Sequence, residues 1–508
     1  MIPLLVAAPL LFAFMLSVLP ALGMEKRSKY LFLIGAISSW AFVPFILLEL
    51  PYAEIVGGWE RPAGIEIAID SYNFPFLVGE LVLFTIVALY IYSGYYPKKI
   101  ENKVYVLLLL IHAGLLGAFI SRDIFNFYVY MEIASVSSFA LVAISKEKGA
   151  RRAAFKYALF SLLASYIFIL AIGIIYLKTG YLNLVLIKER FTFSKEINVA
   201  LGLAFISLLL KSGIFPLHFW LPDAHSKADA PVSALLSGLV VKMPAYGMIL
   251  LILTFPLDTF MQDVLFVTAF ASMFFGIIMA LLQKNSERLL AYHTVSQMGY
   301  VLLGIAMLNP LAAAYYAMAH SLFKGGLFLS VGTIAEHYNT RDLEKLSYRD
   351  SKFLMVSVIL LSLAIGGISP FIGAFGKIML LEGLKDIQRY LFYGGTIGTL
   401  ASFIKLNYYL SKRGKRIHIP MKKEILSLLL GLITLIFGIY LYPHLQVVKD
   451  FLNIAIALTL FYALKKAGVF RLHLPSVFPF DTSEFGKEIN AYMMIFGVVL
   501  LFLLFNLL

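Results

Sequence analysis

Five ionisable side chains lie inside long apolar stretches of this sequence, several residues from the nearer end of each stretch. They are one glutamate and four lysines: Glu132, Lys211, Lys242, Lys324 and Lys377. A charged group at the centre of a bilayer costs roughly 2.5–3.5 kcal/mol on insertion scales, and from these positions the side chains cannot easily reach the lipid headgroups. We therefore expect all five to face a protein interior or a hydrated cavity.

The excess of lysine over carboxylate separates two interpretations of these residues. Glu132 and Lys211 could form a static salt bridge that only holds helices together. One carboxylate cannot pair with all four lysines, however. Burial disfavours the charged form of an amine, so a buried lysine can release and rebind a proton near the working pH, whereas an arginine would stay charged. The residue types therefore favour proton exchange over purely static pairing.

Polar residues near the lysines could relay protons. His320 precedes Lys324 by four residues, which would place both side chains on one face of a helix. His218 and His225 lie in a proline-rich stretch together with Asp223. A lone buried histidine is usually structural, and for His320 that interpretation stays as open as the relay. For His218 and His225 the clustering of polar residues favours the relay.

The sequence offers little for binding a metal or a cofactor. Asp223 and His225 could contact a metal, but prolines on both sides and the lack of a clear third ligand argue against it. The chain has no cysteine, which excludes disulfides, iron–sulfur clusters and thiolate zinc sites. The histidines do not form clear facing pairs for haem, and we interpret His112 and His293 as structural. We therefore expect no cofactor, no metal and no redox or hydrolytic chemistry on this chain.

Membrane-spanning helices are the elements that must position these residues. The chain has 508 residues, of which 61% are hydrophobic and 14% charged, whereas soluble domains have about half and about a quarter. Many apolar runs reach the roughly 20 residues that cross a bilayer as a helix. The sequence predicts an all-α polytopic membrane protein with 14 spans, or 16 if the last two runs also cross, at residues 2–22, 29–49, 74–94, 104–120, 124–144, 155–177, 199–220, 232–254, 264–282, 288–307, 312–334, 353–382, 392–410, 426–442, 447–464 and 490–508.

The charges of the loops alternate along the chain. The loops after spans 1, 3, 5, 9, 11 and 13 hold most of the lysines and arginines, and the loop after span 2 is acidic. By the positive-inside rule the basic loops face the cytoplasm and the N-terminus lies outside, in a multi-pass protein of the plasma membrane. The net charge of +13 therefore indicates topology and not nucleic-acid binding. The same interpretation, not a lipid-specific site, applies to Lys412, Arg413, Lys415, Arg416, Lys422 and Lys423.

The first span lacks a basic leading segment and a convincing cleavage site, so we interpret it as a retained helix and not as a signal peptide.

Spans 7 and 12 contain glycine and proline clusters, Lys211-Ser-Gly-Ile-Phe-Pro216 and Gly366-Gly-Ile-Ser-Pro370, which predict broken helices. Two broken helices in corresponding places indicate an inverted-repeat core.

The buried charges repeat with the broken helices, because Lys242 follows Lys211 by 31 residues and Lys405 follows Lys377 by 28. We therefore count Lys405 among the relay candidates. The expected regions are spans 1–3 in residues 1–100, a first inverted five-helix repeat (spans 4–8) in 101–256, a second (spans 9–13) in 257–412, and C-terminal helices in 413–508.

Four segments resemble the antiporter-like subunits shared by respiratory complex I, multi-subunit (Mrp) cation/proton antiporters and membrane-bound energy-converting hydrogenases. The third segment is long and very specific, and the resemblance covers roughly residues 65–410. The segments are Ser121–Glu132, Ala153–Tyr157, Lys211–His225 with Ala230–Ala234 and Lys242, and His320–Phe328 with the glycine-rich part of span 12.

This resemblance implies a proton-translocating subunit without redox cofactors of its own, beside other membrane subunits such as antiporter-like paralogues and a hydrogenase-like or other redox arm. The implied assembly is an Mrp-type antiporter or a membrane-bound hydrogenase; an M/N-type subunit of a complex I-like NADH/quinone oxidoreductase is the alternative. A stand-alone transporter of an organic substrate would not explain the line of lysines. In the implied path Glu132 and Lys211 form a coupling pair, and Lys242 is the central relay. His320 and Lys324 continue the path, and Lys377 is the terminal site.

The sequence departs from the family pattern in two places. Glu80 lies inside span 3, where we expect apolar residues, and could be an extra proton or cation site or a contact to a neighbouring subunit. The region after residue 425 matches no family segment, and no long lateral helix is evident there, which argues against the largest complex I paralogue.

Overall fold

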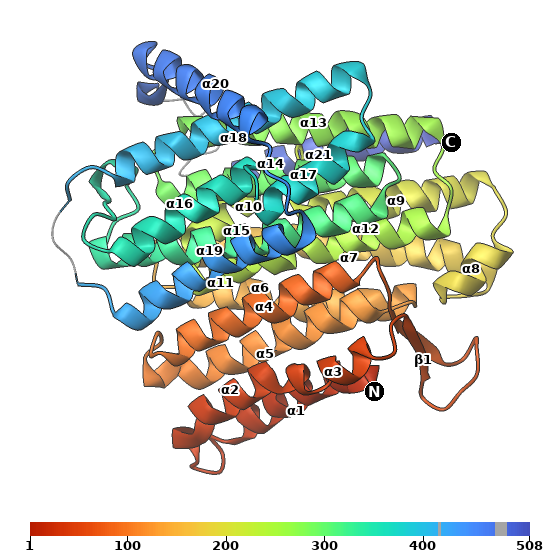
Figure 1. Cartoon of the computed structure of the whole chain (residues 1–508). Helices are drawn as coiled ribbons and strands as arrows, with labels where there is room; N and C mark the ends of the chain where they lie inside the picture. Colours follow the sequence, from red (N-terminus) through yellow and green to blue (C-terminus); the bar gives the residue numbers. More distant parts are fainter. Residues whose placement is uncertain (415–417, 473–484, 508) are drawn as a thin grey trace. The chain divides into compact units, whose positions relative to one another are not determined.

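A computed structural model describes residues 1–414, 418–472 and 485–507 of the chain. Nearly all of this part is helical (Figure 1). The basic residues Lys415 and Arg416 and the end of the last predicted span, Leu508, lie outside the described residues. Two compact units are present and are described separately: unit 1 comprises Met1–Ser212, Leu239–Asp258 and Phe502–Leu508, and unit 2 comprises Gly213–Gly238 and Thr259–Leu501.

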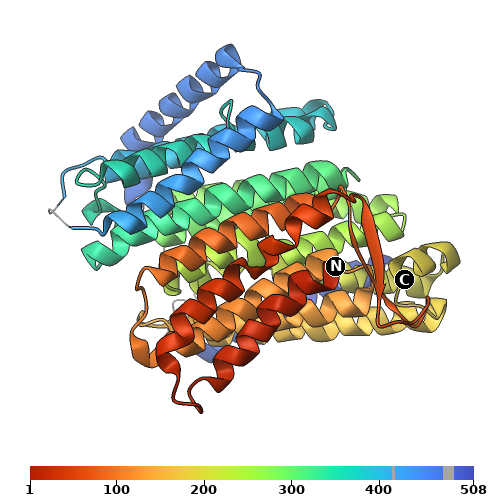
Figure 2. The same cartoon turned by 60° about the horizontal axis from the view of Figure 1, so that its bottom comes forward.

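Unit 1 contains long helices and one antiparallel hairpin. Helix α5 packs against α1 and α6, and α7 packs against α6 and α9. In two views α1, α2, α4 and α5 lie side by side (Figure 1; Figure 2). The elements are α1 (Ile2–Val18), α2 (Ser28–Ile37), α3 (Val43–Leu47), β1 (Tyr52–Val56), β2 (Ile65–Ile69), α4 (Phe74–Tyr92), α5 (Lys98–Ile120), α6 (Ile124–Ile144), α7 (Ala150–Thr179), α8 (Leu184–Arg190), α9 (Lys195–Ser212) and α12 (Lys242–Thr254).

Small residues allow α5 and α6 to approach closely. A methyl group at Gly114 would come within 2.9 Å of Ala134, and one at Gly117 within 2.4 Å of the Tyr130 ring. Glycine at such positions lets helices in a membrane pack backbone to backbone. Helix α6 begins at an N-cap, because the Asp123 side chain accepts a hydrogen bond from the Asn126 N–H at 2.8 Å.

The hairpin lies in the loop after span 2, which was predicted from the sequence only as an acidic loop. Two of its acidic residues have structural partners: Glu66 pairs with Arg61 at 2.5 Å and Asp70 with Arg122 at 2.6 Å. The Asn183 side chain also donates to Glu66 at 2.7 Å. These carboxylates therefore connect the hairpin to the ends of the neighbouring helices.

Unit 2 is built around α14 and α15. Helix α14 packs against α13 and α15, and α15 packs against α16, α17 and α19. The described helices of this unit are α10 (Leu221–Lys227), α11 (Ala230–Leu235), α13 (Thr259–Leu282), α14 (Ser286–Ala306), α15 (Pro310–Tyr338), α16 (Lys352–Gly366), α17 (Ile372–Glu382), α18 (Asp386–Leu410), α19 (Met421–Leu441), α20 (Val447–Lys466) and most of α21 (Phe485–Leu507).

Both predicted helix breaks are present. Helix α9 ends at Ser212 before α10, and α16 ends at Gly366 before α17. The next residue is in each case a glycine with positive φ, +64° at Gly213 and +76° at Gly367, and three residues later a proline follows. Only glycine adopts this backbone conformation readily, so the glycines permit both interruptions.

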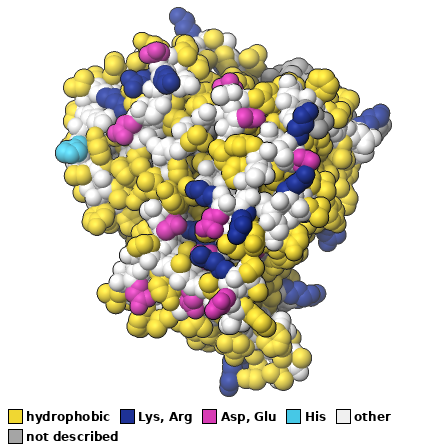
Figure 3. Space-filling model, turned by 90° about the vertical axis from the view of Figure 1, so that its right-hand side faces the viewer, with side chains coloured by type: hydrophobic (Ala, Val, Ile, Leu, Met, Phe, Trp, Pro, Cys, Tyr) yellow, Lys and Arg dark blue, Asp and Glu magenta, His cyan; other side chains and the backbone are white. Residues whose placement is uncertain are grey.

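The chain is a multi-pass membrane protein of almost wholly helical fold. Every predicted span contains a helix, including the last two runs, which form α20 and α21. In the described residues, eleven helices are long and apolar enough to cross a membrane. Hydrophobic side chains cover much of the face shown in Figure 3, with charged side chains of both signs among them. The number of spans and the inverted repeats remain predictions.

Candidate functional site

Glu132 and Lys211 form a buried ion pair in unit 1. Lys211 Nζ lies 2.7 Å from Glu132 Oε1, and the two side chains are 4% and 19% exposed. Glu132 lies in the middle of α6, and Lys211 is the penultimate residue of α9. The pair predicted from the sequence is therefore in direct contact.

Three serine hydroxyls surround this pair. Lys211 Nζ also donates to Ser161 Oγ at 3.2 Å and to Ser135 Oγ at 3.4 Å. Ser165 Oγ donates to Glu132 Oε1 at 2.5 Å. Both charged groups thus have neutral hydrogen-bond partners that would remain if the pair separated. We define Glu132, Lys211 and these three serines as the pair site.

The serines lie on α6, which also holds Glu132, and on α7, which packs against both α6 and α9. Ser135 lies one turn after Glu132 on α6, and Ser161 and Ser165 are four residues apart on α7, so they share one face. None of the three was predicted from the sequence. Their spacing from each other and from Glu132 is the only signal, and it is weak because serine is common in membrane helices.

Lys242 is also buried in unit 1, with 1% of its surface exposed. It is the first residue of α12 and follows a π-helical segment at Leu236–Val240. π-Helical turns are rare and occur frequently at functional sites. One turn further on, the Tyr246 hydroxyl accepts a hydrogen bond from Arg122, which itself pairs with Asp70. This contact fixes the start of α12.

Three buried lysines of unit 2 contact backbone carbonyls, and Lys324 is one of them. Its side chain is fully buried on α15 and donates to the backbone carbonyl of Leu290 on α14. Lys324 Nζ also lies 5.1 Å from the centroid of the Phe328 ring. This geometry allows a cation–π contact in addition to the hydrogen bond.

Lys377 is held at the end of α16. Its Nζ donates to the carbonyls of Ile365 at 3.2 Å and Gly366 at 3.1 Å, and lies 5.1 Å from the Tyr300 ring centroid. The last carbonyls of a helix have no partner within it and accept from basic side chains. A methyl group at Gly367 would come within 2.5 Å of Lys377 Cδ, so glycine is required for this approach.

Lys405 repeats this arrangement at the end of α13. Its Nζ donates to the carbonyls of Leu281 at 2.6 Å and Gln283 at 2.7 Å, and lies 5.1 Å from the Phe470 ring centroid. Within the part of the chain that the structure describes, Lys324, Lys377 and Lys405 form no ion pair with a carboxylate. They are all less than 5% exposed.

The predicted relay residues of unit 2 are brought only partly together. His225 is fully buried on α10, and its ring lies 5.9 Å from the Phe328 ring that Lys324 also contacts. His320 is fully buried one turn before Lys324 on α15. His218 lies in the break before α10 and contacts the Phe275 ring at 4.5 Å between centroids.

Asp223 has a partner that was not predicted from the sequence. Its Oδ1 lies 3.1 Å from Arg288 Nη1, at the first turn of α14. The two residues are 65 positions apart, so no local spacing could have revealed the pair. A second ion pair without a sequence signal, between Glu287 and Arg341, is more deeply buried.

Comparisons with known proteins identify the family to which this chain belongs. The family described as NADH:quinone oxidoreductase/Mrp antiporter, TM, matches residues 121–404, more than half of the chain. The NADH-quinone oxidoreductase subunit N of Desulforudis audaxviator (strain MP104C) is 35% identical over 363 residues, 67% of this chain and 71% of that protein. The chain belongs to the NADH:quinone oxidoreductase/Mrp antiporter family.

Other similarities extend this antiporter-like assignment. The D-type Na(+)/H(+) antiporter subunit of Bacillus subtilis (strain 168) is 28% identical over 360 residues, 69% of this chain and 73% of that protein. A chain of the membrane-bound sulfane sulfur reductase, an archaeal respiratory membrane complex, has a TM-score of 0.78 and 25% identity, with 91% of this chain and 99% of that chain covered. A chain of the Mrp complex from Dietzia sp. DQ12-45-1b, at 23% identity and a TM-score of 0.77, has the same fold over 92% of this chain and 99% of its own.

The resemblance read from four sequence segments is therefore confirmed. The family match includes Glu132, Lys211, Lys242, Lys324 and Lys377, whereas Lys405 falls one residue beyond it and Glu80 lies before it. The individual roles of these residues in this antiporter-like chain stay predictions.

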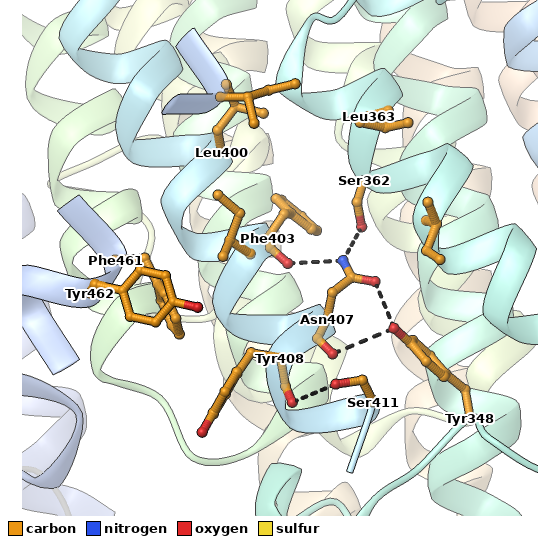
Figure 4. A pocket seen from close by; sticks show the side chains of 13 residues that line it. Tyr348, Ser362, Leu363, Leu400, Phe403, Asn407, Tyr408, Ser411, Phe461 and Tyr462 are labelled. Carbon is orange, nitrogen blue, oxygen red and sulfur yellow. Dashed lines mark hydrogen bonds between the residues drawn. The ribbon is translucent and has the colours of Figure 1, made fainter. Parts of the chain in front are cut away.

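A cavity in unit 2 lies apart from the predicted residues. It has a volume of about 360 Å³ and is lined by side chains of α16, α18 and α20 (Figure 4). Asn407 at its centre donates to Ser362 Oγ at 2.9 Å, and Tyr348 donates to the Asn407 side chain at 3.4 Å. None of the predicted site residues lines this cavity. We regard Lys211, Lys242, Lys324 and Lys377, and not this cavity, as the candidate functional site, because these side chains are ionisable and lie within the residues that the family matches.

Proposed function

We propose that this chain is a proton-translocating, antiporter-like subunit of a multi-subunit membrane complex. The pair site is the observation that carries the proposal, because an ion pair at 2.7 Å between α6 and α9 joins an ionisable acid to an ionisable base. In the proposed order, protons pass from the pair site through Lys242, His320 and Lys324 to Lys377. His218, His225, Asp223 and Lys405 would assist proton entry and relay.

The energy of the pair is large enough to act as a switch. Two unit charges about 4 Å apart interact by about 4 kcal/mol at an effective dielectric constant of about 20. That energy corresponds to about a thousandfold change in a protonation equilibrium. Separating Glu132 from Lys211 would therefore favour release of the lysine proton to the next carrier.

Proton exchange and static pairing make opposite predictions for Lys211→Arg. Arginine keeps the positive charge and can still pair with Glu132, but it does not release its proton. We expect the complex to assemble while proton uptake into inverted membrane vesicles is lost. Lys178→Arg, at the exposed end of α7, is the matched control and should transport at the wild-type rate. Wild-type transport by Lys211→Arg would show that the pair is structural.

We propose an Mrp-type cation/proton antiporter or the membrane arm of a membrane-bound hydrogenase as the parent complex. The similarity to a D-type Na(+)/H(+) antiporter subunit and to a chain of the sulfane sulfur reductase complex supports these assemblies. The 35% identity to an NADH-quinone oxidoreductase subunit N supports the alternative, a complex I-like enzyme. In each case the redox cofactors would lie on partner subunits.

Purification of the intact complex from its native membrane distinguishes these assemblies. A hydrogenase-like or quinone-reductase partner would favour a redox-driven arm, whereas antiporter subunits alone would favour the Mrp type. Recovery of this chain as a monomer with transport activity would contradict all three.

We also propose a plasma-membrane location with the N-terminus outside. The natural sequence has no cysteine, so single introduced cysteines give a clean test. In intact cells a membrane-impermeant maleimide should label Glu60→Cys in the hairpin loop and should not label Lys422→Cys before permeabilisation. Both residues are exposed. The reverse pattern of labelling would contradict the orientation.

A further inference from the structure

Glu80, whose role the sequence leaves open, is part of a buried hydrogen-bonded cluster in unit 1. Glu80 Oε1 lies 2.6 Å from His112 Nδ1, and both side chains are at most 1% exposed. His112 Nε2 lies 3.3 Å from Ser39 Oγ, which donates to the Leu5 carbonyl at 2.8 Å. Helices α4, α5 and α1 and the turn before α3 thus meet at this cluster, which we call the Glu80 site.

The serine fixes the tautomer of the histidine. Ser39 uses its only proton in the bond to the Leu5 carbonyl, so at His112 it can only accept. His112 Nε2 must therefore carry a hydrogen. At the opposite side of the ring, the 2.6 Å contact between Nδ1 and Glu80 Oε1 then requires one further proton, on either the nitrogen or the oxygen.

The second carboxyl oxygen favours the proton on Glu80. Among the described residues, the fully buried Glu80 Oε2 has no hydrogen-bond partner. A carboxylate without partners for one oxygen is costly to bury, whereas the carbonyl oxygen of a neutral carboxylic acid demands less. The Phe84 ring stacks on His112 at 4.1 Å between centroids and adds to the apolar surroundings.

No other charge lies close to the cluster along its own helices. On α5 the nearest other ionisable residue, Tyr105, is seven positions from His112, about 10 Å along the helix axis, and on α4 the nearest, Tyr90, is ten positions from Glu80. Helix α1 has no ionisable side chain. The ionisable residues of the elements around the site are Lys29 and Tyr30 on α2, Glu66 on β2, Tyr90 and Tyr92 on α4, Lys98, Lys99, Glu101, Lys103 and Tyr105 on α5, Tyr128, Tyr130 and Glu132 on α6, and Lys242 and Tyr246 on α12.

We propose that the Glu80 site is a second proton-binding site in unit 1, separate from the pair site, which holds one proton and exchanges it during turnover. This inference rests on the proposed function. In the loaded form Glu80 donates its O–H to His112 Nδ1, and the site is neutral. Release breaks that O–H bond, passes H⁺ to a water molecule and leaves one negative charge on the carboxylate; uptake reverses both steps.

The protonation of Glu80 can be measured in the purified complex by infrared spectroscopy. A buried carboxylic acid has a C=O stretching band that shifts in D₂O and is absent from a carboxylate. We expect Glu80→Gln to remove one such band. Ser39→Ala deletes the acceptor of the His112 Nε2–H bond and should shift the same band without removing it. If neither variant alters the carboxylic bands, Glu80 carries no proton and the proposal fails.

Proton transport tests the exchange itself. A glutamine at position 80 can still donate to His112 Nδ1 but cannot release a proton, so Glu80→Gln should assemble and lose proton transport. Ser38→Ala removes the neighbouring hydroxyl, which donates to the Gly35 carbonyl at 2.8 Å outside the cluster, and should retain proton transport. Wild-type transport by Glu80→Gln would make the site purely structural. If Lys211→Arg loses transport and Glu80→Gln does not, only this inference falls; if Lys211→Arg is active, the proposed function falls.

Discussion

The structure holds Lys211 of unit 1 and three buried lysines of unit 2 in different ways. In unit 1 Lys211 contacts a carboxylate from another helix and two serine hydroxyls. In unit 2 Lys324, Lys377 and Lys405 each donate to backbone carbonyls and lie 5.1 Å from the centroid of an aromatic ring.

This difference indicates two roles, with Lys211 as a switch that depends on its ion pair and the lysines of unit 2 as proton carriers. A carboxylate strongly favours the charged ammonium over the neutral amine, and its effect depends on the distance between α6 and α9. A carbonyl oxygen accepts a hydrogen bond from an ammonium and from a neutral amine alike. We infer that lysines in unit 2 can change protonation with little rearrangement, whereas Lys211 changes protonation only when its pair opens.

The largest effect should come from Glu132→Ala, which gives Lys211 only neutral partners, as in unit 2. Removing one member of a buried ion pair costs about 3–5 kcal/mol, because the other charge stays buried. We expect the complex to assemble with a lowered Tm and to lose coupled proton transport. Transport into inverted vesicles and thermal unfolding of the purified complex measure the two effects.

Ser165→Ala is the matched control for this variant. It removes only the hydroxyl that donates to Glu132 at 2.5 Å and leaves the ion pair in place. A lost hydrogen bond to a charged group is worth about 1.5–3 kcal/mol, so the decrease in Tm should be smaller and transport should persist. Normal proton transport by Glu132→Ala would remove the distinction between the two units.

Lys377 should separate the two roles of a unit 2 lysine. Lys377→Met leaves the carbonyls of Ile365 and Gly366 without this donor, at a cost of about 1–3 kcal/mol. Lys377→Gln can still donate to them but cannot titrate. We expect both variants to lose proton transport and only the methionine variant to lower the Tm clearly. Transport at the wild-type rate by Lys377→Gln would show that Lys377 only caps the end of α16 and does not carry protons.

The sequence predicted those features that leave a strong local signal. The apolar run 124–144 coincides with α6, and the glycine–proline clusters coincide with both helix breaks. Glu132 and Lys211 were each predicted as ionisable groups inside apolar runs, and their role as a coupling pair was what the family resemblance implied. The strands Tyr52–Val56 and Ile65–Ile69 each hold one glutamate among mostly apolar residues, and the charges of this loop were interpreted only as a topology signal.

Features that depend on tertiary contacts could not be predicted. Every residue has a carbonyl, so nothing in the sequence marks Leu290 or Gly366 as the acceptor of a lysine. Asp223 was grouped with nearby histidines, but the structure pairs it with Arg288 on another helix. His112 was interpreted as structural because a lone buried histidine usually is. Its partner Glu80 lies 32 positions away on a different span, so no local spacing links the two.

The smallest effect should come from an ion pair at the surface of unit 1, which has the same charges as the pair site without its burial. Lys178 Nζ lies 2.7 Å from Glu196 Oε1, with side chains 42% and 54% exposed. Glu196 precedes the apolar run that begins at residue 199. The hydrogen bond from Lys178 lowers the pKa of Glu196 from 4.5 to about 2.

Because the pKa of Glu196 is lower in the folded protein, its stabilisation is present above pH 4.5 and disappears as the pH falls toward 2. Water and salt screen such exposed pairs, so Glu196→Gln should change the Tm very little at neutral pH and not at all near pH 2. Proton transport should equal that of the wild type, because no buried charge loses its partner. A loss of transport as large as that of Glu132→Ala would mean that any broken pair impairs the complex, and burial would then not explain the importance of Glu132.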